Sequence, residues 1–158
     1  MTRLVLLCLL VAGCSSSAPA PTTMTSPMAP SDTGELGPVS VGTVVVDGRE
    51  LDVAVVSTPD DRSQGLRGVA DLGELQGMLF TWGGETVSSR FTMADTVISL
   101  DIAFFDPDGG FVDGFTMIPC DETPCPSYAA AGPYAYALES PAGSLTGIGS
   151  GSVLVVGG

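Results

Sequence analysis

The sequence lacks two residue types that many enzymes depend on: it contains no histidine and no lysine. The absence of histidine excludes a Ser-His-Asp or Cys-His catalytic site within this chain, and it removes the commonest zinc ligand. Chemistry by carboxylates, tyrosine or arginine remains open. From the sequence we therefore expect no metal site and no bound cofactor.

Positive charge is scarce as well. Five basic residues, all of them arginine, stand against 18 acidic residues, and the formal net charge is −13. Nucleic acid is therefore not an expected partner, because phosphate binding needs clustered cations. A basic patch for an anionic lipid surface is not expected either. The acidity predicts either a well-solvated surface or a site for a cation or cationic ligand.

Long apolar runs are also missing, since no stretch approaches the roughly 18 residues that a membrane-spanning helix needs. The longest apolar segment near the start, residues 4–11, follows Arg3 and leads into the small residues Ala12 and Gly13. A short positive start, a short apolar core and small residues before a cut site are typical of an export signal.

Cys14 comes directly after these small residues, and Val11-Ala12-Gly13-Cys14 resembles the lipobox of bacterial lipoproteins. The resemblance implies that the cysteine thiol carries a diacylglycerol and that the signal is cut before it. Two or more acyl chains on one residue anchor a protein stably to a membrane. The alternative is an ordinary secretory signal with an incidental cysteine. We expect an exported protein anchored at the outer face of the plasma membrane, or in the periplasm or outer membrane where one exists. Ser15 suits outer-membrane sorting.

The chain divides into three parts: a signal at residues 1–13, a lipidated cysteine with a linker at residues 14–40, and a globular domain at residues 41–158. The linker is rich in Ser, Thr, Pro and Ala, so it buries too little apolar surface to offset its ordering entropy. The remaining length suffices for one core. We expect a monomer.

Most apolar segments of the domain read as short strands. Asp47-Gly48 between two apolar runs predicts a β-hairpin. Thr58 and Pro59 predict a helix start, and this helix should continue through Leu66. The predicted fold is mostly β, a compact sandwich or partly open barrel with one or two short helices, the second at residues 142–145. Further strands are predicted at residues 43–46, 51–57, 77–82, 91–93, 98–105, 111–118, 134–139 and 152–156.

Two cysteines lie in the globular domain, Cys120 and Cys125. In an exported protein a disulfide is the expected state. A redox-active pair and a metal site are the alternatives, but four residues separate the cysteines, rather than the two of the thioredoxin motif. Two cysteines without histidine also make a poor metal site.

Several segments, taken together and in order, resemble the bacterial and archaeal DUF192 family. The resemblance implies a compact, mostly β domain and an exported protein, but no reaction, because the family has no established activity. The segments are residues 58–66, the "GMLF" of residues 77–80, residues 91–96 where the family has "FWMKNT", the "LDIAF" of residues 100–104, the "YxLExPAG" of residues 136–143, and Gly147, Ile148 and Gly151 near the end.

The chain also departs from the family pattern. Residues 92–95 replace the family's Trp-Met-Lys-Asn, Arg67 stands in place of a methionine, and Val69 in place of an arginine. The family's terminal Gly-Asp is Gly151-Ser152 here. These changes predict that any anion-binding ability of the family is lost and that the cleft is acidic instead.

Asp101 is the leading candidate residue because it interrupts an apolar strand, where a carboxylate is costly unless paired or solvated. It is a binding residue beside Met93 and Asp95, or else a structural aspartate. If Asp95 and Asp101 converge, their repulsion would raise one pKa and favour a bound cation.

The leading functional hypothesis is a non-enzymatic binding or accessory domain of the cell envelope, with a small-molecule or envelope ligand of unspecified kind. The alternative is a carboxylate-dependent enzyme, for example one that hydrolyses carbohydrate. That class needs two carboxylates about 5 to 10 Å apart, and Asp95 with Asp101 is the nominated pair. A third reading is a structural protein without a pocket.

Replacement of Cys14 tests the predicted anchor. Cys14→Ser removes the thiol that would accept the lipid, so we expect the variant to leave the detergent-soluble membrane fraction and to lack the mass of the acyl chains. Cell fractionation with mass spectrometry measures both. Unchanged mass and unchanged membrane association of the variant would contradict the prediction.

Overall fold

The computed structural model describes residues 34–157. The predicted signal, Cys14 and the linker as far as residue 33 lie outside the described residues. Within the described part, no helix is long and apolar enough to cross a membrane.

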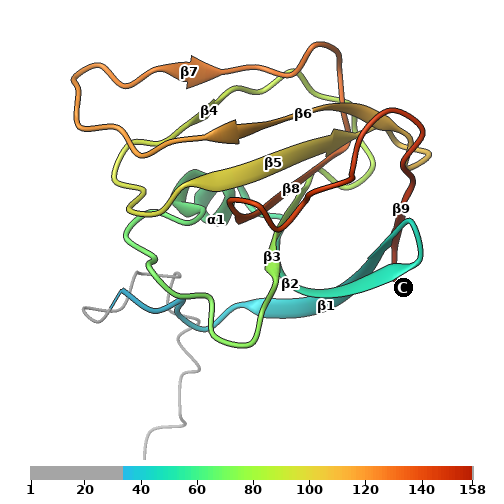
Figure 1. The fold of residues 1–158 in the computed structure, drawn as a ribbon, viewed down its shortest axis with the longest axis horizontal. Coiled ribbons are helices and arrows are strands. Elements are labelled where there is room, and N and C mark those ends of the chain that lie inside the picture. The colour runs from blue at the N-terminus through green and yellow to red at the C-terminus, as the bar shows by residue number, and fades with distance from the viewer. Residues whose placement is uncertain (1–33, 158) are drawn as a thin grey trace, which may run out of the picture.

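A seven-stranded sheet forms most of the fold, in the order β6-β5-β8-β3-β2-β1-β9, and it curls into a half-barrel (Figure 1). All neighbouring strands are antiparallel except β2 and β3, which are parallel. The mostly β, partly open barrel expected from the sequence is confirmed. The strands of this sheet are β1 (Ser40–Val46), β2 (Arg49–Val56), β3 (Gly77–Thr81), β5 (Leu100–Phe105), β6 (Phe111–Met117), β8 (Tyr136–Pro141) and β9 (Leu154–Val156).

The predicted hairpin joins β1 and β2. Asp47 and Gly48 both adopt positive φ values, 51° and 82°, which are the left-handed conformations that a tight hairpin turn requires. The Asp47 carboxylate also accepts hydrogen bonds from the Ser152 hydroxyl at 2.7 Å and the Val153 amide at 3.0 Å. The Ser152 bond, and then the Val153 bond, lower the pKa of Asp47. This side chain therefore ties the hairpin to the start of the last strand.

One helix, α1 (Pro59–Gln64), is present among the described residues, and its start is the predicted one. The Thr58 hydroxyl accepts a hydrogen bond from the Asp61 amide at 3.2 Å, which satisfies a free helix-end donor. The helix ends earlier than expected because Gly65 has a φ of +49°. The second helix, expected at residues 142–145, is a series of turns instead, since Gly143 has a φ of +87°.

Both faces of the sheet are buried, and alternate residues of each central strand point to opposite cores. In β3, for example, Met78 and Phe80 join one core while Leu79 joins the other. The first core contains Ile102 and Phe104 of β5, and the second contains Ala103 and Phe105. Such continuous apolar runs are expected of strands that are covered on both sides.

A small two-stranded sheet of β4 (Phe91–Thr92) and β7 (Ser127–Tyr128) covers the first core. The Phe91 ring lies 5.6 Å from that of Phe104, and the Tyr128 ring lies 5.9 Å from that of Phe115 in β6. The predicted disulfide between Cys120 and Cys125, in the segment leading to β7, is confirmed.

The last part of the predicted linker also lies against the domain. Glu35 forms a parallel bridge with Asp71, and the Gly34 carbonyl accepts a hydrogen bond from the Ala70 amide at 2.6 Å. Leu36 packs against the first core. Contacts of the globular part thus begin at residue 34 in the described structure.

Gly109 provides a test of how β9 is held. A Cβ atom added there would lie 2.0 Å from the Leu154 carbonyl oxygen, and the φ of Gly109 is +84°. Gly109→Ala should therefore destabilise the domain by about 2–4 kcal/mol, through backbone strain and displacement of β9. Urea unfolding measures the difference. Gly84→Ala is the matched control, because Gly84 has a φ of +85° but no neighbour within 4 Å, and it should cost about 1 kcal/mol. Equal effects of the two substitutions would contradict the prediction.

Candidate functional site

Glu139 is a buried carboxyl group in the middle of the sheet. It lies in β8, between β3 and β5, where its cross-strand neighbours are Met78 and Ile102. Because Ala137 two residues earlier belongs to the first core, strand alternation places the Glu139 side chain on the same face. Only 5% of Glu139 is exposed. No hydrogen bond or ion pair to its carboxyl group occurs among the described residues, and burial raises its pKa from 4.5 to about 8.

Glu139 lines a cavity of about 370 Å³ between α1, the end of β3 and β4. We call this the Glu139 cavity. Its apolar lining includes Phe80, Trp82 and Phe91. The Phe80 and Phe91 rings pack edge to face with centroids 5.2 Å apart, so one wall of the cavity is a rigid aromatic surface.

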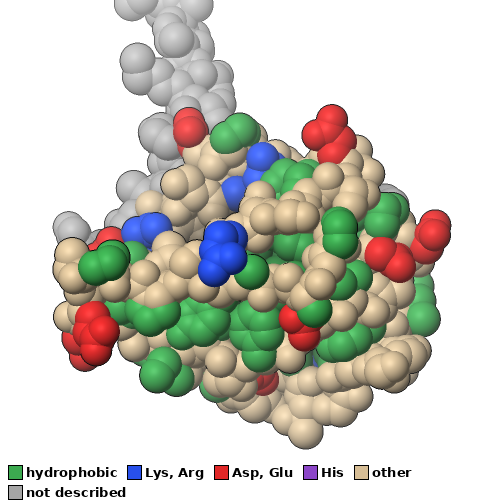
Figure 2. Space-filling view, turned by 90° about the horizontal axis from the view of Figure 1, so that it is seen from above, with side chains coloured by type: hydrophobic (Ala, Val, Ile, Leu, Met, Phe, Trp, Pro, Cys, Tyr) green, Lys and Arg blue, Asp and Glu red, His purple; other side chains and the backbone are tan. Residues whose placement is uncertain are grey.

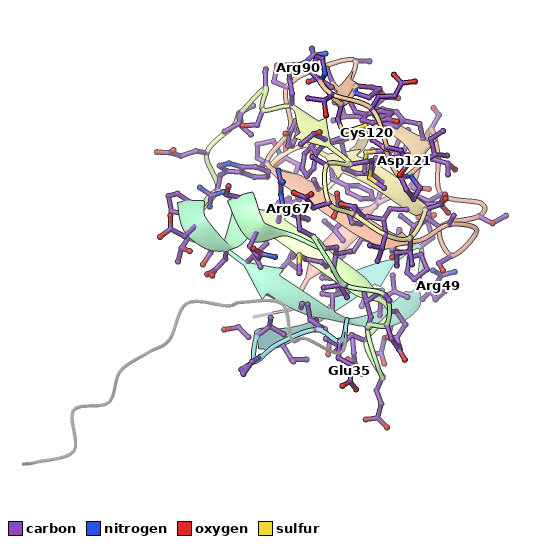
Figure 3. The ribbon with its side chains drawn as sticks, turned by 90° about the vertical axis from the view of Figure 1, so that its left-hand side faces the viewer. Glu35, Arg49, Arg67, Arg90, Cys120 and Asp121 are labelled. Carbon is purple, nitrogen blue, oxygen red and sulfur yellow. A yellow bond between two sulfur atoms is a disulfide. The ribbon has the colours of Figure 1, made fainter. Side chains whose placement is uncertain are left out.

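Three arginines surround the same cavity: Arg62, Arg67 and Arg90. They are three of the four arginines that the structure describes, the fourth being Arg49. Figure 3 shows Arg67 beside the α1 ribbon and Arg90 above it on the β4–β7 side. Figure 2 shows basic side chains gathered on one part of the upper face, with acidic side chains mostly toward its outline. The positive charge of an acidic domain is thus concentrated at one place.

Two of these guanidinium groups, those of Arg62 and Arg90, are held in position by uncharged neighbouring groups and by an aromatic ring. Arg62 donates to the carbonyl oxygens of Ser57 and Thr81 and lies 5.1 Å from the centre of the Trp82 ring, within the range of a cation–π contact. Arg90 donates to the Ser127 hydroxyl at 2.6 Å and to its carbonyl at 2.8 Å. These contacts orient the charges without neutralising them.

The expectation of an acidic cleft is therefore wrong for this cavity, which holds three arginines and one acidic side chain. Arg67 and Asp95 form an ion pair at 3.1 Å, with side chains 34% and 82% exposed. The pairing of Arg67 with Asp95, 28 residues apart in the sequence, is not visible from their spacing.

The three residues nominated from the sequence do not share a cavity. Met93 is 1% exposed and belongs to the first core. Asp95 is on the surface and does not line the Glu139 cavity. It has a φ of +60°, a conformation that aspartate tolerates better than most residues. Neither residue thus lies where a ligand of the Glu139 cavity would touch it directly.

Asp101 has a clear structural role. Its Oδ1 accepts a hydrogen bond from the Thr116 hydroxyl at 2.7 Å, and its Oδ2 accepts bonds from the amides of Gly143 at 2.7 Å and Leu145 at 3.2 Å. Both oxygens are therefore engaged in joining β5 to β6 and to the turns after β8. Asp101 also lines a second cavity, of about 310 Å³. The structural alternative for Asp101 accounts for its place in an apolar strand.

A shared cation site of Asp95 and Asp101 finds no support in this geometry. Among residues 34–157, no group of three or more histidine, cysteine or acidic side chains is arranged to hold a metal ion. Sequence reasoning missed Glu139 as a site residue. The available signal was the same one that drew attention to Asp101, an acidic residue within an apolar strand segment.

Fold and cavity together define a class: a small, curled β-sheet domain with a buried acid and a basic rim in one cavity. The profile of the DUF192 family, described as an uncharacterized ACR, matches residues 42–156. The chain belongs to this family. A search of the curated proteins gave no match.

Two solved structures are similar to this one. A Sinorhizobium meliloti 1021 protein, described as a candidate transcription regulator, is 28% identical with a TM-score of 0.66, over 75% of this chain and 95% of its own. A protein of unknown function from Novosphingobium aromaticivorans DSM 12444 is 26% identical with a TM-score of 0.64, over 91% of this chain and 99% of its own.

The raised pKa of Glu139 makes stability depend on pH. A carboxyl group with a folded-state pKa near 8 binds its proton more tightly folded than unfolded, so its contribution is fully present below about pH 4.5 and is lost as the pH rises through 8. We expect the free energy of unfolding to fall by about 2–4 kcal/mol between pH 5 and pH 8, less than the full linkage value because the group faces a cavity that water can enter.

Glu139→Gln should remove this loss, because glutamine does not titrate. Urea unfolding at several pH values measures it, and Glu85→Gln, at an exposed position, controls for the loss of one charge. Parallel pH profiles for wild type and Glu139→Gln would contradict the assignment.

Proposed function

We propose that this protein is a lipid-anchored protein of the cell envelope whose β domain binds a small ligand in the Glu139 cavity, without catalysing a reaction. The anchor rests on the sequence pattern that ends at Cys14. The binding role rests on one observation above all: a nearly buried, unpartnered carboxyl group opens into a cavity that carries three arginines.

The composition of the cavity supports binding. Small-molecule sites are concave, partly aromatic, and carry a few fixed polar groups, and volumes of about 300–1,000 Å³ are usual. The Glu139 cavity has aromatic walls, oriented guanidinium groups and a volume of about 370 Å³. Arginine presents a planar fork of donors that matches carboxylate and phosphate groups. An anionic group is therefore the expected recognition feature of the ligand.

The enzyme alternative has less support. Hydrolysis of a glycosidic bond uses two carboxyl groups across a groove, whereas Glu139 is the one acidic side chain among the residues that line this cavity. The pair nominated from the sequence does not replace it, because Asp101 is engaged in three hydrogen bonds and Asp95 is paired with Arg67.

The Sinorhizobium protein is described as a candidate regulator of transcription. We do not propose that role for this chain. The net charge of −13 opposes binding to a phosphate backbone. The three clustered arginines line one small cavity, whereas binding to a duplex backbone needs basic residues spread along a face or a helix.

The test is a search for small ligands by NMR. Amino acids, sugars, sugar acids and phosphate esters are titrated into the 15N-labelled, unlipidated Cys14→Ser chain. At least one anionic compound should shift the amide signals of residues that line the Glu139 cavity. The double variant Arg67→Ala/Arg90→Ala should weaken that binding about 10- to 100-fold, as expected for lost charge-assisted hydrogen bonds.

Arg49→Ala is the matched control. Arg49 donates to the Ser144 carbonyl at 2.7 Å and does not line the Glu139 cavity, so its loss should leave binding unchanged. Shifts that map to another part of the domain, or no shift from any compound at millimolar concentration, would overturn the proposal.

A further inference from the structure

The acidic and basic side chains of the Glu139 cavity do not pair with each other. The Glu139 carboxyl group receives no hydrogen bond or ion pair from the arginines that share its cavity. Arg62 and Arg90 are bonded to carbonyl and hydroxyl oxygens, and Arg67 is paired with the exposed Asp95. Glu139 therefore belongs to the wall of the cavity that the sheet forms. The arginines come from α1, the turn after it and the segment before β4.

A buried polar group without a partner is unfavourable, and a buried charge without a partner is more so. Glu139 is 5% exposed and its cross-strand neighbours, Met78 and Ile102, are apolar. A ligand that brings a cationic donor to this carboxyl group would supply the missing partner. The arginines, which are more exposed, would meet the anionic part of the same ligand.

We infer that the Glu139 cavity binds a small soluble zwitterion, with a primary amine that meets the Glu139 carboxylate and a carboxylate that meets the arginines. This inference rests on the proposed binding function and adds the class of ligand. Complementary charge at both ends also fixes the orientation of the ligand and rejects molecules that carry only one of the two charges.

The aromatic walls indicate what lies between the two charged ends. Phe80 and Phe91 pack edge to face. The Trp82 ring contacts the Arg62 guanidinium, and its centroid lies 5.3 Å from that of the Tyr134 ring. Such surfaces favour an apolar or ring-shaped spacer over a polar one. An ω-amino acid with an aromatic or aliphatic spacer between its amine and its carboxylate therefore fits the cavity better than a hydroxylated zwitterion of the same length.

Four matched probes test the inference by calorimetry on the unlipidated Cys14→Ser chain at pH 8. These are 4-(aminomethyl)benzoate, which carries both charges, benzylamine and benzoate, which carry one each, and 4-(hydroxymethyl)benzoate, which replaces the amine by an alcohol. The zwitterion should bind at least about tenfold more tightly than any of the others, as expected for one added buried charge pair.

Substitutions distinguish the contacts of the ligand's amine from those of its carboxylate. Glu139→Gln should weaken the zwitterion at least about tenfold while leaving benzoate unchanged, and Arg67→Ala should weaken both. Arg49→Ala should change neither. Affinity for the zwitterion should rise by about 50-fold from pH 6 to pH 8, more steeply below pH 7 than above it, because Glu139 must lose its proton to meet the amine. Arg62, Arg67 and Arg90 are the charged groups that share the cavity with Glu139, and Glu139→Gln should flatten the profile.

Equal binding of benzoate and the zwitterion, with no effect of Glu139→Gln, would overturn this inference while leaving an anion-binding cavity and the proposed function intact. Equal binding of 4-(hydroxymethyl)benzoate and the zwitterion at pH 8 would also overturn it, because the charged amine would then contribute no more than a neutral hydroxyl group. Absence of binding by all four probes, together with no hit in the wider search by NMR, would remove the proposed function itself.

Discussion

The central position of β8 is the constraint on which the site depends. This strand pairs with β3 on one side and with β5 on the other, and both faces of the sheet are covered by apolar cores. The side chains of β8 therefore alternate between the two covered faces of the sheet. A register shift by one residue would exchange the two faces, so the pairing that buries Ala137 and Leu138 also fixes the direction of Glu139.

That constraint explains why the acid remains unpaired. In the middle of a doubly covered sheet, a carboxyl group meets the side chains of its cross-strand neighbours, and these are Met78 and Ile102. The surrounding elements could have supplied a donor. Instead α1 and the segment before β4 supply guanidinium groups whose hydrogen bonds go to other oxygens. The buried acid is thus a cost that the fold carries, and such costs are common at functional sites.

Much of the local structure followed from the sequence because its causes are local. The Asp47-Gly48 turn, the Thr58 cap and the short loop between Cys120 and Cys125 each depend on residues a few positions apart. Helix length was overestimated because the conformation of Gly65 decided it. The strand order and the parallel pairing of β2 with β3 could not be predicted from the sequence, because they depend on which apolar faces meet after folding.

The candidate site also depends on contacts between residues that are distant in the sequence. In the sequence, Asp101 and Glu139 share one pattern: each is an acidic residue within an apolar strand. Sequence reasoning nominated only Asp101 as a candidate binding residue. The structure separates them through partners that are distant along the chain. Asp101 lies opposite Thr116 and beneath the amides of Gly143 and Leu145, so its charge is satisfied. Glu139 lies opposite two apolar residues and opens into a cavity. Whether a strand carboxylate is structural or available for a ligand therefore depends on cross-strand pairing, which a single sequence does not encode locally.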